Sequence, residues 1–236
     1  MAKIGRTRHL KRIAIPKSIP LQNKKEYTWL IKPHPGPHPL KFSMPLAVLL
    51  RDVLGVAKTQ KEVRSILNSR LLKVDGKVRT EVKFPVGLMD VISLESSGKY
   101  YRLIVDSKAR IAVQELSKSE TSKKIVKVVK KHVVKKGKIN LTFHDGRNLL
   151  ADNNVHVGDS VIITIPEAKF SSLIKLQIGV KCLITEGKHA GMIATLKEII
   201  LRKEGKENEA KLEANGSEFI TVAKYLFPVD DSIKQV

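Results

Sequence analysis

Two Asp-Gly pairs, at residues 75–76 and 145–146, constrain the fold of this chain more than any other feature. Each pair lies between short runs rich in Leu, Val and Ile, such as "LLKV" before the first and "INLTF" before the second. Asp-Gly is the strongest short-range hairpin signal, because a type I′ turn requires positive φ at both central positions. A further turn is expected at Gly158-Asp159, ahead of a strand from Ser160 to Ile165. Successive short strands with glycine-bearing turns predict small β-barrels.

Two helices are expected ahead of the first hairpin. Ser43 can cap the first helix, Pro45 suits its first turn, and Gly55 suits its end. The second begins at Thr59, which forms a capping box with Glu62 because each side chain can reach the other residue's backbone amide. Helical spacing places Val63, Ile66 and Leu67 on the buried side of this helix, and Lys61, Arg64 and Asn68 on the opposite side.

The first 43 residues are expected to form an extended basic arm that becomes ordered on its anionic partner. The stretch "KPHPGPHPLKF" has prolines at 33, 35, 37 and 39, which exclude a helix and favour polyproline geometry. Trp29 is expected to anchor the arm on a neighbouring domain. His34 and His38 are interpreted as loop histidines, because a metal site would need a carboxylate or cysteine nearby.

The charge of the chain indicates a polyanionic partner. Its 44 Lys and Arg residues against 23 Asp and Glu residues give a net charge of +21, which would cost stability unless neutralised. Nucleic acid is the leading candidate for that partner. A membrane is the rival, but no apolar run approaches the roughly 18 residues of a membrane span, and the N-terminus lacks the apolar core of a signal peptide. We therefore expect a cytoplasmic protein, in which the single Cys182, flanked by apolar residues, is a buried and inert thiol.

The segment from Lys123 to Phe143 is the most basic part of the chain, with eight lysines and no acidic residue in its first sixteen positions. An amphipathic membrane helix and a disordered tail are two alternatives for such a segment. Its apolar residues before Gly137 are all β-branched, and "KKGK" supplies a turn into "INLTF", so a basic β-hairpin is favoured. Its lysines would face nucleic acid or, alternatively, would protect a solvated sheet edge from pairing.

Two modules resemble known RNA-binding elements. The stretch "TQKEVRSILNSRLLKVDGKV", within Thr59 to Leu94, resembles the alpha-L RNA-binding motif. That resemblance implies that the helix and hairpin flank RNA through Lys58, Lys61, Arg64, Arg70, Lys73 and Lys77. The strand "VKCLIT", the loop "TEGKHAG" and the strand "MIATLKEIIL" resemble a KOW motif of small SH3-like barrels, although an ordinary turn would read similarly.

The order of these parts resembles the archaeal-type small-subunit ribosomal protein family S-four-e. The matching stretches are "RHLKRIAIPKS" from Arg8, "KPHPGPHPLKFSMPLAVLLRDVL" from Lys32, "DGKVRTEVKFPVGLMDVI" from Asp75, "FHDGRNLL" from Phe143, "ITEGKHAGMIA" from Ile184 and "ANGSEFIT" from Ala214. The resemblance implies a structural, non-catalytic protein that binds rRNA in the small ribosomal subunit. Glu186 departs from the glycine of related KOW loops, and an acid there would repel phosphate.

The predicted fold class is α+β, predominantly β, in four parts: a basic arm at 1–43, an alpha-L module at 44–95, a central β-barrel-like domain at 96–172 and a KOW-like SH3-type barrel at 173–236. The expected partners are small-subunit rRNA and neighbouring ribosomal proteins, with no membrane, small-molecule substrate, catalytic residue, metal or cofactor. The residues expected to contact RNA are Arg6, Arg8, Lys11, Arg12, Lys58, Lys61, Arg64, Arg70, Lys73, Lys77, Arg79, Lys123, Lys124, Lys127, Lys130, Lys131 and Lys188.

Two other functions compete with this one. Alpha-L motifs also occur in pseudouridine synthases and a tRNA synthetase, but the chain offers no Gly-rich phosphate loop and no paired acids in a recognisable site, and Asp145 and Asp159 stand in turns where Asp is common. A free RNA-binding factor, such as a KOW-type elongation factor or an assembly chaperone, would share the same basic modules.

Overall fold

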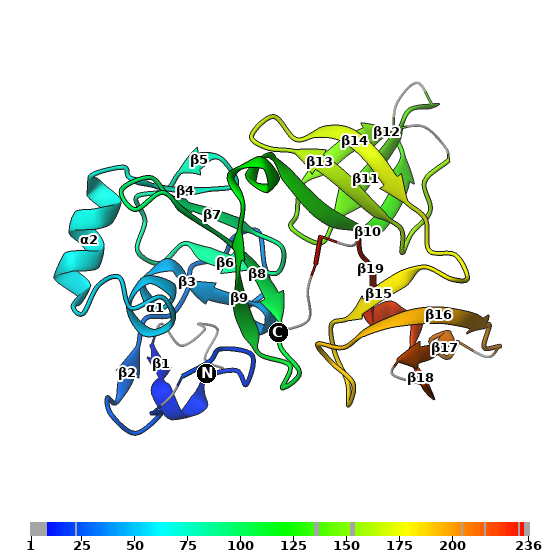
Figure 1. The fold of residues 1–236 in the computed structure, drawn as a ribbon, viewed down its shortest axis with the longest axis horizontal. Coiled ribbons are helices and arrows are strands. Elements are labelled where there is room, and N and C mark those ends of the chain that lie inside the picture. The colour runs from blue at the N-terminus through cyan, green and yellow to red at the C-terminus, as the bar shows by residue number, and fades with distance from the viewer. Residues whose placement is uncertain are drawn as a thin grey trace, which may run out of the picture.

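A computed structural model describes residues 9–21, 23–134, 137–151, 154–203, 205–214, 216–230 and 232–233. Within them, β-strands dominate and form three five-stranded antiparallel sheets and two two-stranded ones (Figure 1). The predicted α+β class with mostly β content is confirmed. Among the described residues, four short 3-10 helices connect strands: η1 (Arg12–Ala14), η2 (Leu40–Phe42), η4 (Lys118–Ser122) and η6 (Ala223–Tyr225).

The N-terminal segment is folded onto the two helices and the first large sheet, which together we call the first domain. An arm ordered only by its partner was expected here. Strand β1 (Leu10–Lys11) pairs with β2 (Trp29–Leu30). Ile15 and Ile19 are buried in the same apolar core as the helices, because this segment has enough aliphatic side chains to cover them. Trp29 is 56% exposed, so its predicted role as the anchor is wrong.

The two helices lie next to this segment. Strand β3 (Ser43–Pro45) leads into α1 (Leu46–Val48) and a π-helical turn, η3 (Leu49–Val53), so Ser43 is a strand residue and the predicted cap is wrong. Gly55, with φ 63°, follows this helix as expected. Helix α2 (Gln60–Asn68) starts with the predicted capping box of Thr59 and Glu62. Val63 and Leu67 are buried and Ile66 is half-buried, which confirms the predicted stripe.

The first large sheet has the order β5-β4-β7-β8-β9. Asp75 and Gly76 have φ values of 50° and 71°, which confirms the predicted turn. The sheet continues past residue 95, where a domain boundary was expected, because β8 pairs with β7. Its strands are β4 (Leu72–Val74), β5 (Lys77–Val78), β7 (Val91–Leu94), β8 (Lys99–Val105) and β9 (Ile111–Leu116), and the neighbouring β6 (Pro85–Gly87) pairs with β3.

The central sheet has the order β12-β11-β10-β13-β14. Lys123 to Phe143 forms a strand pair in it, with Val133 opposite Ile139, so the predicted basic hairpin is confirmed. Val126, Val128, Leu141, Phe143 and Ile163 fill its core. The strands are β10 (Lys123–Val133), β11 (Ile139–Phe143), β12 (Asn148–Ala151), β13 (Ser160–Thr164) and β14 (Lys169–Ile174).

The C-terminal sheet has the order β18-β17-β16-β15-β19 and packs beside the central sheet (Figure 1). Cys182 is buried in its core with Leu196 and Leu212, and burial raises the pKa of this thiol to about 12. The predicted inert thiol is confirmed. The strands are β15 (Lys181–Ile184), β16 (Ile193–Ile200), β17 (Glu209–Ala214), β18 (Ser217–Val222) and β19 (Leu226–Pro228).

Candidate nucleic-acid interface

One group of basic side chains surrounds α2 and the first hairpin. We call it the helix surface: Lys58, Lys61, Arg64, Arg70 and Lys77, all exposed. Hydrogen bonds of the capping residues fix the start of the helix. The Glu62 carboxylate accepts a hydrogen bond from the backbone N–H of Lys58 at 2.8 Å, and the backbone N–H of Glu62 donates to Thr59 Oγ1 at 3.3 Å. The hydrogen bond from the Lys58 backbone N–H, together with one that the Thr59 hydroxyl donates to Glu62 Oε1 at 3.0 Å, lowers the pKa of Glu62. Because the apolar stripe faces the core, the basic residues of α2 point to solvent, where phosphate can reach them.

Two basic residues of the same hairpin are partly used within the protein. Lys73 is half-buried and forms an ion pair with Glu95. The Arg79 guanidinium lies 4.3 Å from the centroid of the Phe84 ring, a cation–π contact. Both were expected to contact RNA, and both have less freedom to do so than the helix surface.

A second basic group lies on the β10–β11 hairpin. We call it the hairpin surface: Lys130, His132 and Lys138, all exposed. Lys130 is opposite Thr142 and His132 is opposite Asn140, so these side chains share one face of the strand pair. Asn140 Nδ2 lies 3.2 Å from His132 Nε2. Lys131 is opposite the buried Leu141 and is half-buried, whereas Lys123 is exposed where β10 begins.

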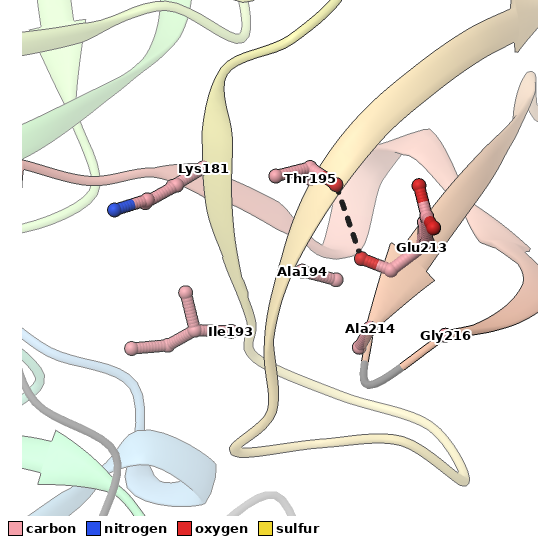
Figure 2. Close-up of a pocket in the computed structure, with 7 residues that line it drawn as sticks. All are labelled: Lys181, Ile193, Ala194, Thr195, Glu213, Ala214 and Gly216. Carbon is pink, nitrogen blue, oxygen red and sulfur yellow. Dashed lines mark hydrogen bonds between the residues drawn. The ribbon is translucent and has the colours of Figure 1, made fainter.

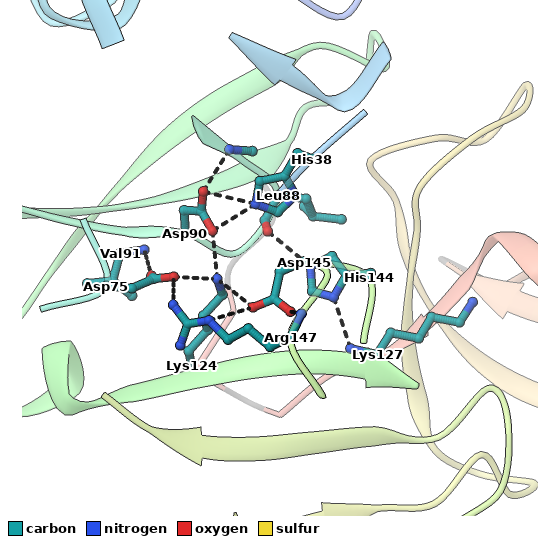
Figure 3. Close-up of polar contacts among 11 residues, drawn as sticks. His38, Asp75, Leu88, Asp90, Val91, Lys124, Lys127, His144, Asp145 and Arg147 are labelled. Atoms are coloured by element: carbon teal, nitrogen blue, oxygen red, sulfur yellow. Dashed lines mark hydrogen bonds and ion pairs between the residues drawn. The ribbon is translucent and has the colours of Figure 1, made fainter. Parts of the chain in front are cut away.

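Lys124, which was predicted to contact RNA, is instead buried at the centre of a charged network (Figure 3). Its Nζ atom lies 2.6 Å from Asp90 Oδ1, 2.7 Å from Asp75 Oδ2 and 3.1 Å from Asp145 Oδ2. Burial would lower the pKa of Lys124, but the three carboxylates outweigh this effect and raise it. This lysine is therefore a charged structural residue, and the prediction is corrected.

Arg147 and His38 complete the network (Figure 3). Arg147 Nη2 donates to Asp75 Oδ2 at 2.6 Å, and its Nε lies 3.3 Å from Asp145 Oδ2. His38 Nε2 donates to both oxygens of Asp90, at 2.9 and 3.0 Å. Burial would raise the pKa of Asp90, but His38 and Lys124 hold it well below its usual range. His38 was interpreted as a loop histidine, and its pairing with a residue 52 positions away left no local sequence signal.

Lys127 is also engaged inside the protein, so its predicted contact with RNA is corrected too. Its Nζ donates to the carbonyl oxygens of Lys224 at 2.7 Å and Leu226 at 2.5 Å, and burial lowers its pKa to about 8. The Lys127 backbone N–H donates to His144 Nδ1 at 3.1 Å, while His144 Nε2 donates to Leu88 O at 3.1 Å. Burial lowers the pKa of His144 to about 4. These contacts join β10 to the C-terminal sheet and to the first domain.

The other predicted residues divide between surface and interior. Arg12 is 2% exposed, with its Nε donating to Asn23 O at 2.8 Å and its Nη2 lying 3.3 Å from Glu26, so its predicted RNA contact is corrected. Lys11 and Lys188 are exposed. Arg6 and Arg8 lie outside the described residues.

The KOW-like loop is in contact with other parts of the protein. Glu186 forms an ion pair with Lys41, and the His189 ring stacks on Phe219 with centroids 4.2 Å apart. A Cβ added to Gly191 would lie 2.1 Å from Asp106 O, so only glycine fits against the turn between β8 and β9. This loop therefore packs on the first domain, and its acid is neutralised within the chain.

The outer face of the C-terminal sheet carries balanced charge. Lys197 pairs with Glu213 at 2.7 Å, and Lys211 pairs with Glu218 at 2.5 Å. A surface hollow of about 280 Å³ opens beside Glu213, whose backbone carbonyl accepts the Thr195 hydroxyl at 3.2 Å (Figure 2). Since these cations are already paired, this face has less to offer a phosphate than the helix or hairpin surface.

Within the part of the chain that the structure describes, no three His, Cys, Asp or Glu residues are grouped to bind a metal ion. The described helices include none that is long and apolar enough to cross a membrane.

Three family models match successive parts of the chain. The model described as "RS4NT (NUC023) domain" matches residues 4–41, "S4 domain" matches 44–92, and "Ribosomal family S4e" matches 97–170. The last two matches cover the helix surface and the hairpin surface, respectively.

Similar proteins cover nearly the whole chain. "Small ribosomal subunit protein eS4" of Methanosphaera stadtmanae is 40% identical, over 97% of this chain and 95% of its own. The protein of that name from Methanothermobacter thermautotrophicus is 38% identical, over 99% and 97%. The crystal structure of the 30S ribosomal protein S4e from Thermoplasma acidophilum has a TM-score of 0.69 and 32% identity, over 82% of this chain and 98% of that one.

Proposed function

The chain belongs to the ribosomal S4e family, and from this premise we infer that it binds rRNA through its helix surface and its hairpin surface. It is a structural constituent of the small ribosomal subunit and serves in translation. The observation that carries the proposed RNA contact is the set of exposed Lys and Arg side chains on the S4 domain, including Lys61, Arg64 and Lys77. Its partners are rRNA and neighbouring ribosomal proteins, in the cytoplasm.

The proposed mechanism is electrostatic. Lys and Arg neutralise phosphates and release counterions, which gives affinity that does not depend on base sequence and falls steeply with salt. Phe, Trp and Tyr make up only 5% of the chain, and neither the helix surface nor the hairpin surface includes one of them. Stacking of splayed bases therefore contributes little, and selectivity comes from RNA shape.

We propose that this binding involves no catalysis. S4e is a family of ribosomal proteins and not a class of enzymes. The buried titratable groups Lys124, Asp75, Asp90 and Asp145 are paired with one another, as expected for structural charges.

The test of the RNA contact replaces Lys61, Arg64 and Lys77 together with glutamine. We expect weaker binding to small-subunit rRNA, and a plot of log K against log salt that is less steep by about two to three units, because about 0.7–0.9 counterion is released per phosphate contact. The melting temperature should change little, since all three side chains are exposed. The matched control replaces Lys197 and Lys211, which are paired with glutamates. Unchanged affinity and slope in the triple variant would remove the helix surface from the RNA site.

The rival function is that of a free factor that binds RNA transiently. Sedimentation of cell extract through a sucrose gradient at high salt separates the two functions. A resident protein stays in the 30S peak, whereas recovery at the top of the gradient would contradict the ribosomal assignment.

A further inference from the structure

The helix surface and the hairpin surface lie far apart in the fold. Helix α2 lies at one end of the long axis of the molecule, and the sheet that contains β10, β11 and β12 lies in the opposite half (Figure 1). The two surfaces belong to different sheets, since β4 and β5 pair within the first and β10 to β12 within the central one. Any RNA bound at both must therefore span the contact between these two sheets.

That contact is closed by charge. Asp75 and Asp90 come from the first domain, whereas Lys124, Asp145 and Arg147 come from the central one, and together they form the buried network (Figure 3). Here the buried Lys124 and the half-buried Arg147 face three carboxylates, so both cations are already paired within the protein. A single RNA segment running along this contact would find Lys124 and Arg147 already neutralised.

The contact is also closely packed. A Cβ added to Gly76 would lie 2.9 Å from Ile165 Cγ2 and 3.0 Å from Pro166 Cβ, so the first hairpin turn touches the central domain directly. Leu88 and Ile104 of the first domain share an apolar cluster with Ile125 of β10. Separating the two domains would leave buried charges without their partners and would expose apolar surface to water. Both effects cost free energy, so they oppose movement at this contact.

We propose that this protein is a brace between two separate rRNA segments: the helix surface holds one, the hairpin surface holds the other, and the buried network fixes their relative position. The proposal rests on the proposed function, and it adds that the two surfaces have different RNA partners and a fixed geometry. The C-terminal sheet stands outside the pair, because Lys197 and Lys211 on its outer face are paired with glutamates.

Tethered hydroxyl-radical probing tests the first part. Cys182 is buried with a pKa of about 12, so an iron chelate can be attached selectively to an introduced surface cysteine. The variants are Gln60→Cys on α2, Asn148→Cys on β12 and, as a control on the edge strand of the C-terminal sheet, Ser217→Cys on β18. All three positions are exposed. Each labelled full-length protein is bound to small-subunit rRNA that is purified from cells of the source organism.

We expect the probes at 60 and 148 to cut two groups of nucleotides in different helices of the rRNA, and the probe at 217 to cut weakly. Cutting of one and the same RNA helix by both probes would overturn the brace. If the unlabelled parent protein did not bind small-subunit rRNA at all, the proposed function itself would be contradicted. Failure of the brace and failure of the proposed function are therefore distinguishable.

Loosening the network tests the second part. In the Lys124→Met variant, the helix surface should remain bound to its RNA, so the cutting pattern from position 60 should be retained. We expect the cuts from the cysteine at position 148 to spread to neighbouring nucleotides or to be lost. Arg147→Met, which removes a half-buried member of the network, gives the same test if Lys124→Met does not fold. Patterns from position 148 that remain unchanged in a folded variant would show that the network does not fix the geometry.

Discussion

Replacing Lys124 with methionine measures what it costs the folded protein to keep the carboxylates of the network buried without their central cation. Methionine is of similar length and apolar, so the change removes the ammonium and leaves the volume largely filled. Three carboxylates within 3.1 Å of Nζ, those of Asp75, Asp90 and Asp145, then lose their central cation. Of the side chains described in the network, Arg147 and His38 remain paired with them.

The magnitude follows from that imbalance. Removing one partner from a buried ion pair costs about 3–5 kcal/mol, because an uncompensated charge stays buried. A typical free energy of unfolding is about 5–15 kcal/mol, so a large part of it would be lost. One kcal/mol shifts the melting temperature by about 2–4 °C in proteins of about 150–250 residues. We therefore expect Lys124→Met to melt about 6–20 °C lower at pH 7.

Differential scanning calorimetry at several pH values is the assay. Between pH 7 and pH 4 the deficit of the variant should shrink, because carboxylates buried without a cation have raised pKa values and become neutral on mild acidification. The control is Lys130→Met, an exposed lysine on the same strand, which should melt within about 2 °C of the parent. A deficit for Lys124→Met no larger than that of the control, or one that grows on acidification, would refute the reasoning.

Three further predictions concern single residues. Burial lowers the pKa of His144 to about 4, so below about pH 6.5 this residue binds a proton in the unfolded chain but not in the folded protein. Up to about 3 kcal/mol of the free energy of unfolding is therefore lost between pH 6.5 and 4. In urea titrations, His144→Gln should lose less stability than the parent over this pH range. Gly191→Ala should cost about 1–3 kcal/mol more than Gly205→Ala in the same titrations, because both glycines have positive φ but only Gly191 meets backbone, at Asp106; equal costs would contradict this contact. Cys182 should react with a thiol reagent at pH 8 only after unfolding, and fast reaction of the native protein would contradict its burial.

The parts of the fold that were predictable are those whose partners are close in sequence. Thr59 and Glu62 form their capping box across three residues, and Asp75-Gly76 determines its own turn. The apolar stripe of α2 likewise needs only helical periodicity. Such local patterns are sufficient because the interactions that they specify close within one turn of chain.

The boundary near residue 95 could not be predicted in this way. A hairpin pattern does not say which sheet a strand joins, and β8 begins only five residues after β7 ends at Leu94. That short connection places β8 beside β7, so the first sheet extends to Leu116. We propose the domain boundary after Leu116, at the start of η4, in place of residue 95.

The corrected RNA contacts of Lys124 and Lys127 have a common physical cause. A run of lysines next to Ile and Val reads as basic surface, but the first half of β10 is buried on both sides: Ile125 packs with Leu88 and Phe227, whereas Val126 belongs to the core of the central sheet. A lysine at this place needs carboxylates or carbonyls within the protein. The partners of Lys124 lie 49, 34 and 21 positions away, so only the tertiary fold reveals them.

The positions of the Lys124 partners also show that the matched S4 domain is not self-contained in this chain. The match at residues 44–92 ends before β8 and β9, and it includes Asp75 and Asp90 but neither Lys124 nor Arg147. Cut out alone, the matched region would keep two buried carboxylates without Lys124 and Arg147, and it would keep β7 without its neighbour β8. A charged pair of this kind contributes little net stability over an apolar one, yet it penalises any arrangement that separates its members. The network therefore acts less as a source of stability than as a requirement that the first and central domains be held together, which is the geometry that a brace between two RNA segments needs.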